Sequence, residues 1–67
     1  MYVVLEIQKD NDTVATLVNS YATRNEAENK YHSILSAAAI SEVDVHSALM
    51  CTDEGIPIKN EHYSHLE

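Results

Sequence analysis

The N-terminal segment alternates apolar and polar residues with the two-residue period of a β-strand. Over residues 2–8, every second position is Val, Leu or Ile, and β-branched residues dominate. The polar run at 9–12 predicts a turn, because Asn and Asp tolerate left-handed backbone. The alternation resumes over 13–21, so the two segments are predicted to form a β-hairpin.

Residues 23–39 carry the pattern of an amphipathic helix. Thr23 and Glu26 have the spacing of a capping box. In this box the Thr23 hydroxyl accepts from the amide of Glu26, and the Glu26 carboxylate reaches back to the amide of Thr23. The apolar residues that follow form one stripe at helical spacing: Ala27, Tyr31, Ile34, Leu35 and Ala38.

The rest of the chain predicts a second hairpin, with strands over 43–52 and 56–63. The turn between them, Asp53-Glu54-Gly55, contains the single glycine of the chain at a place where positive φ is needed. Pro57 has no N–H to donate to a neighbouring strand, so it places the last strand at an edge or bends its start.

These elements give the order ββαββ and an α+β fold, a four-stranded antiparallel sheet with one helix packed on one face. We expect the 67-residue chain to form a single domain over residues 1–65. Leu66-Glu67 is interpreted as a purification-tag remnant.

The apolar stripe of the helix needs one face of this sheet. We expect that face to be Val3, Leu5, Ile7, Val45 and Leu49. The opposite face would then carry Tyr2, Val4, Ala48 and Met50 beside Glu6 and His46. Such a partly apolar face indicates a partner surface.

Chain length points in the same direction. A core of this size supplies only about 3–5 kcal/mol of net stability, and small domains gain more from a disulfide, a metal or a partner chain. Cys51 is the single cysteine, which excludes a disulfide within the chain. Self-association as a homodimer or larger ring is therefore favoured over a monomer with a few exposed apolar residues.

The formal net charge is −7, from four basic and eleven acidic residues. Lys9, Arg24, Lys30 and Lys59 are scattered, whereas binding to phosphate backbones needs clustered cations. Direct nucleic-acid binding is not expected. The acidity is interpreted as favouring solubility, with mimicry of nucleic-acid charge as the alternative.

The sequence lacks a segment that resembles a signal peptide and a run of apolar residues long enough for a membrane span. A lone cysteine fits a reducing compartment. We therefore expect a cytoplasmic location and no membrane partner.

Four histidines invite a metal-site interpretation. His62 and His65 have odd spacing, so a continuous strand would point them to opposite faces, and His32 and His46 lie far away along the chain. The chain contains neither Cys-x-x-Cys nor His-Glu-x-x-His. We predict no metal and no cofactor, and interpret the terminal histidines as exposed.

Catalysis is not indicated either. Cys51 lies in an apolar strand of an acidic chain, where a thiol is not activated, and we assign it to the core face. The paired carboxylates Asp10 and Asp12, or Asp53 and Glu54, fall in turns without a pocket that would raise one pKa above the other. The chain is predicted not to be an enzyme.

Several segments nonetheless resemble known sequences. Residues 4–8, 24–32, 37–39, 45–50 and 62–65 resemble short uncharacterised proteins encoded in phages and prophages of gut Firmicutes. The resemblance covers nearly the whole chain and implies a small phage protein made in the cytoplasm of the bacterial host. It implies no catalytic residues.

The resulting hypothesis is a non-enzymatic, self-associating phage protein with an interaction or virion-assembly role, which binds itself, with a host or virion protein as a further candidate partner. One alternative is a counter-defence protein that sequesters a small nucleotide-like signal or blocks a host protein. Another is a metal-binding module. Tyrosine suits interfaces and small-ligand sites. The candidate ligand-binding residues are Tyr2, Arg24, His32, His46, His62 and Tyr63.

Overall fold

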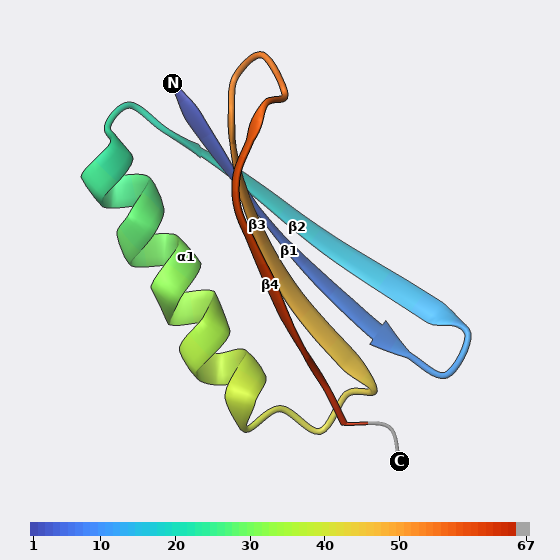
Figure 1. The fold of residues 1–67 in the computed structure, drawn as a ribbon. Coiled ribbons are helices and arrows are strands. Elements are labelled where there is room, and N and C mark those ends of the chain that lie inside the picture. Colours follow the sequence, from blue (N-terminus) through green and yellow to red (C-terminus); the bar gives the residue numbers. More distant parts are fainter. Residues whose placement is uncertain (66–67) are drawn as a thin grey trace.

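The computed structural model describes residues 1–65 and has the predicted element order ββαββ. The elements are β1 (Tyr2–Asp10), β2 (Thr13–Tyr21), α1 (Arg24–Ala39), β3 (Val45–Thr52) and β4 (Pro57–Ser64). One helix lies along one side of the sheet, as Figure 1 shows. The predicted α+β fold is thereby confirmed.

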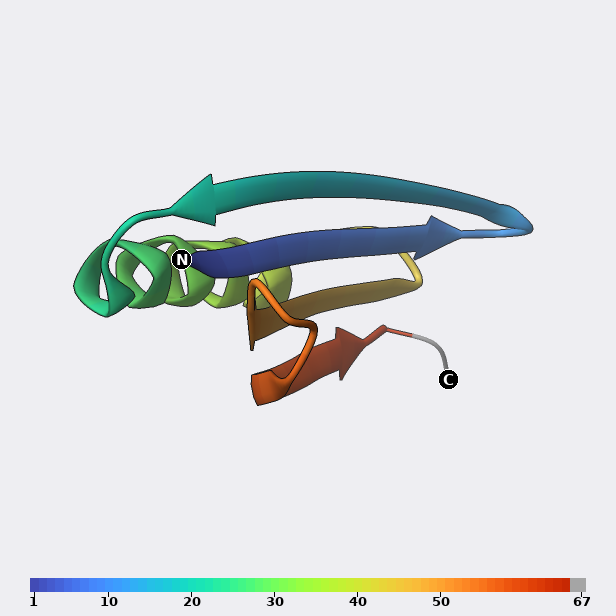
Figure 2. The same ribbon diagram turned by 90° about the horizontal axis from the view of Figure 1, so that it is seen from above.

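The four strands form one sheet in the order β2-β1-β3-β4, and each neighbouring pair is antiparallel. Figure 2 shows this order from above. Because β2 and β3 are both antiparallel to β1, they run parallel to each other. Helix α1 connects them by crossing over β1, and β2 and β4 are left as the two edge strands.

Helix α1 begins at the predicted cap. The amide of Glu26 donates to the Thr23 hydroxyl oxygen at 3.3 Å. The reciprocal half of the capping box differs from the prediction, because the Glu26 carboxylate accepts from the Thr23 hydroxyl at 2.9 Å and not from its amide. Among residues 1–65, the structure contains no helix with the length and apolar character needed to cross a bilayer.

The two hairpin turns follow the residues that the sequence offers. Asn11 has a φ of 55° in the β1–β2 turn, and Gly55 has a φ of 88° in the β3–β4 turn. Pro57 opens β4, which is an edge strand as predicted. The β3–β4 register shifts between Met50 and Cys51, next to this proline.

The prediction of which sheet face the helix covers was wrong. Val4, Ala48 and Met50 are buried in one cluster with Ala27, Tyr31 and Ile34 of α1. The residues expected beneath the helix lie on the other side of the sheet: Val3, Leu5, Ile7, Val45 and Leu49. The row that was predicted to be uncovered is therefore the one that packs on α1.

The backbone explains this reversal. The amide of Asp53 donates to the carbonyl oxygen of Met1 at 3.1 Å, so odd-numbered residues of β1 direct their main-chain groups towards β3 and even-numbered residues direct theirs towards β2. For L-residues, this orientation places the even-numbered side chains on the side where a right-handed β2–α1–β3 crossover runs. Chain handedness and register, and not hydrophobicity, select the covered face.

We call the side of the sheet under α1 the covered face and the opposite side the open face. The covered face consists of Tyr2, Val4, Glu6, Gln8, Ala15, Leu17, Asn19, Tyr21, His46, Ala48, Met50, Lys59, Glu61 and Tyr63. The open face consists of Val3, Leu5, Ile7, Lys9, Val14, Thr16, Val18, Ser20, Val45, Ser47, Leu49, Cys51, Asn60, His62 and Ser64.

Candidate functional site

The six candidate ligand-binding residues do not form one site. Tyr2, His46 and Tyr63 belong to the covered face, and His62 belongs to the open face. Arg24 and His32 lie on exposed positions of α1. Within this set, His46 and Tyr63 are direct cross-strand neighbours, whereas Tyr2 lies at the other end of the sheet, opposite Thr52.

His46 belongs to a buried polar cluster beneath α1. Its Nε2 lies 2.6 Å from a carboxylate oxygen of Glu6, and the Gln8 side-chain amide donates to the same oxygen at 3.1 Å. His46 is 4% exposed, and its Nδ1 is buried without a hydrogen-bond partner among residues 1–65. The Glu6 carboxylate satisfies one ring nitrogen, and the cluster serves to hold β1 and β3 together beneath the helix.

A second set of polar contacts joins α1 to β4. Lys59 is 3.0 Å from Glu28, which also lies 3.5 Å from Arg24. The hydrogen bond with Lys59 is the largest of the effects that lower the pKa of Glu28. Lys59 also lies 5.9 Å from the ring centroid of Tyr31. Lys59 thus links the last strand to the helix from the solvent side.

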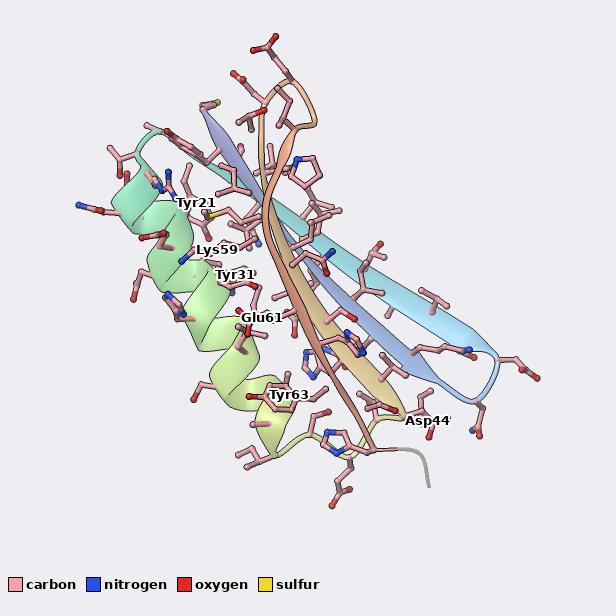
Figure 3. All side chains as sticks on the ribbon, viewed as in Figure 1. Tyr21, Tyr31, Asp44, Lys59, Glu61 and Tyr63 are labelled. Carbon is pink, nitrogen blue, oxygen red and sulfur yellow. The ribbon has the colours of Figure 1, made fainter. Side chains whose placement is uncertain are left out.

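The hydroxyl of Tyr31 completes this link by donating to Glu61 at 3.0 Å. Burial, together with the hydrogen bond and the negative charge of Glu61, raises the pKa of Tyr31 to about 12. Figure 3 shows Tyr31, Lys59 and Glu61 between the helix and the sheet. Because the phenol stays protonated, it acts as a hydrogen-bond donor and not as a base.

Sequence reasoning missed the most distinctive surface, which is the open face. Its centre consists of aliphatic side chains from three neighbouring strands: Val3, Leu5, Ile7, Val14, Val18, Val45 and Leu49. No Asp or Glu occupies a paired strand position of the open face in residues 1–65, and Asp53 follows beyond its end, in the turn after β3. Lys9, near the end of β1, is its one Lys or Arg side chain.

The composition of the open face changes across the strands. β2, β1 and β3 contribute mainly aliphatic side chains, whereas β4 contributes Asn60, His62 and Ser64. Val14 and Val18 are 59% and 60% exposed. The apolar area is therefore centred on the β2 side of the sheet, and no part of residues 1–65 covers it, as the side of the sheet away from α1 in Figure 1 shows.

Cys51 also lies on the open face, which corrects its assignment to the core face. It is a free thiol and is 9% exposed. Its pairing with Val3 places it at the end of the aliphatic area. The thiol is buried, and no hydrogen bond joins it to another side chain among residues 1–65.

Residues 1–65 contain no group of three or more His, Cys, Asp or Glu side chains that could hold a metal ion. No pocket was found in this part of the chain. Comparisons with protein-family models, with curated proteins and with solved structures found no match.

Proposed function

We propose that this chain is a non-enzymatic, self-associating protein whose open face is covered by the open face of a second copy. The observation that supports this proposal is an aliphatic surface with no Asp or Glu at its paired strand positions, on a chain of net charge −7. Two copies of an acidic protein repel each other, and this repulsion is least where neither copy presents a carboxylate.

The size of the open face supports the same proposal. Strands of eight or nine residues, four side by side, give a flat area on the order of 500 Å². Side chains that protrude from the sheet increase its accessible area, which brings the open face near the ~600 Å² per partner found in small specific interfaces. Face-to-face packing of two sheets, about 10 Å apart, would bury the aliphatic side chains of both copies.

We infer that this association serves an interaction or virion-assembly role in the bacterial cytoplasm, which is the role expected from the resemblance of the sequence to phage and prophage proteins. In such a role the open face of the sheet is the surface through which copies join. The polar contacts beneath α1 support the fold on which this surface is displayed.

The test compares charges added on and off the open face. Leu5→Glu places a carboxylate at the centre of the face, and Ser33→Glu places the same charge on an exposed position of α1. We expect the molar mass by light scattering to fall for Leu5→Glu and to stay unchanged for Ser33→Glu. Both variants should keep the far-ultraviolet circular dichroism of the wild-type chain.

Leu49→Lys separates loss of apolar contact from charge repulsion, because it adds a positive charge to the negative chain. It should lower the assembled mass as Leu5→Glu does. A wild-type chain that stays monomeric at its highest soluble concentration would refute the proposal, and so would an unchanged mass in both open-face variants.

A further inference from the structure

The two edge strands differ in how their free main-chain groups are protected. β4 has Pro57, a register shift at its start, and the charged residues Lys59 and Glu61. These are the features by which proteins prevent edge strands from pairing with other chains. β2, with the sequence TVATLVNSY, has none of them: its nine residues contain no charge and no proline.

The direction of the main-chain groups along β2 follows from the ladder. Even-numbered residues of β1 point towards β2, so the pair Asp10–Thr13 exchanges hydrogen bonds at the two-residue turn. The alternation along β2 then directs the N–H and C=O groups of even-numbered residues outward. The open row of donors and acceptors belongs to Val14, Thr16, Val18 and Ser20.

Leu17 is a second observation that the open face does not explain. It belongs to the covered face, yet it is 58% exposed, because it lies on the edge strand β2, to one side of the strands β1 and β3 on which α1 mainly packs. Covering the open face would leave this leucine in water. A partner at the β2 edge would bring a side chain beside it.

We propose that β2 pairs antiparallel with β2 of a second copy about a two-fold axis at Leu17. This register overlaps all nine residues and pairs Thr16 with Val18, each of which has an outward N–H and C=O. It sets Leu17 of one copy against Leu17 of the other, at the close spacing of a non-hydrogen-bonded pair. The two four-stranded sheets then form one sheet of eight strands.

A second copy fits this edge better than a foreign segment does, because the strand is complementary to itself. In the nine-residue register, no cross-strand pair places two charges opposite each other. The two-fold axis runs perpendicular to the sheet, so both helices lie on the same side. The two open faces consequently join into one continuous apolar surface.

This edge contact is separate from the face contact of the proposed function. With both contacts formed, two eight-stranded sheets stack into a closed tetramer. Loss of either contact alone leaves a dimer, and loss of both leaves a monomer. The number of copies in each variant therefore distinguishes failure of the edge proposal from failure of the face proposal.

The main test is Thr16→Pro, which removes one outward N–H and leaves the ladder between β1 and β2 intact. Asn60→Pro is the matched control, since its N–H points outward from β4. We expect the molar mass by light scattering to halve for Thr16→Pro and to stay unchanged for Asn60→Pro. An unchanged mass for a folded Thr16→Pro would overturn the edge contact.

A second variant and a measurement on the wild-type chain cover the case in which Thr16→Pro fails to fold. Leu17→Lys puts two lysines opposite each other and should also halve the mass, without altering the open face. In wild-type protein, the amides of Thr16 and Val18 should exchange with deuterium much more slowly than those of Asn60 and His62. Equally fast exchange at both edges would contradict the pairing.

Discussion

The two faces of this sheet use similar side chains for different purposes. On the covered face, Val4, Ala48 and Met50 are almost fully buried under α1, and polar residues such as Glu6 and His46 accompany them. On the open face the aliphatic row is longer and carries no carboxylate, yet residues 1–65 leave it uncovered. The more hydrophobic of the two rows is thus the one that α1 does not cover.

This difference teaches that hydrophobicity alone does not say which face a helix covers. The face was fixed by the two-residue turn after Asp10, which sets the direction of the β1 main chain, and by the handedness of the crossover. An apolar row that topology leaves uncovered is typical of an interaction surface. The following predictions compare the two faces, starting from the largest expected effect.

Met50→Ala should produce the largest loss of stability. Met50 is 0% exposed, so truncation leaves a cavity and should lower the free energy of unfolding by about 2–5 kcal/mol. Its neighbour Leu49 lies on the open face, and Leu49→Ala should cost about 1 kcal/mol or less in dissociated chains. Urea unfolding at low protein concentration measures both. Equal costs would contradict the assignment of the two faces.

Glu6→Ala should have the next largest effect. The substitution leaves both ring nitrogens of the buried His46 without a partner, which should cost about 1–3 kcal/mol in urea unfolding. Glu6→Gln is the matched variant, because its amide oxygen still accepts from His46, and it should cost less. If the two variants are equally unstable, the hydrogen bond to His46 is not what stabilises this part of the covered face.

Thr23→Ala tests the N-terminal cap of α1 without changing a residue on either face of the sheet. Loss of the hydroxyl that accepts from Glu26 should lower the free energy of unfolding by about 1 kcal/mol. Ser33→Ala, at an exposed position in the middle of α1, should be close to neutral and serves as the control. A larger effect at Ser33 than at Thr23 would argue against the observed cap.

Tyr31 gives an effect that appears only at alkaline pH. Its pKa is about 12 in the folded chain, compared with about 10 in an unfolded one. The protonated phenol therefore contributes stability that is fully present below pH ~10 and is lost as the pH rises towards ~12. Urea midpoints across this range should fall more steeply in wild-type protein than in Tyr31→Phe. Parallel curves would show that Tyr31 is not responsible.

Much of the fold was predictable from local patterns. The start of the helix, both turns and the edge position of β4 followed from Thr23, Asn11, Gly55 and Pro57, since each acts on its own neighbours. The covered face was not predicted, because it depends on strand order and crossover handedness. The β2-β1-β3-β4 order had not been derived from the sequence.

The candidate site was predicted less well, because its residues were chosen by side-chain type. His46 satisfies a hydrogen bond inside the fold, while His32 and His62 lie on unrelated surfaces. The informative signal was the absence of Asp and Glu from one alternating row in three strands. That signal could have been found by placing the acidic residues on the two faces of the predicted strands.

The proline and the register shift at the start of β4 have a consequence for growth. A sheet in which both edge strands can pair with other chains can add copies without limit and form a fibre. In the proposed assembly β2 is the edge strand that pairs, and the two-fold axis would leave no free β2 edge once two copies have joined. In the proposed assembly, Pro57 would therefore limit growth to a small number of copies.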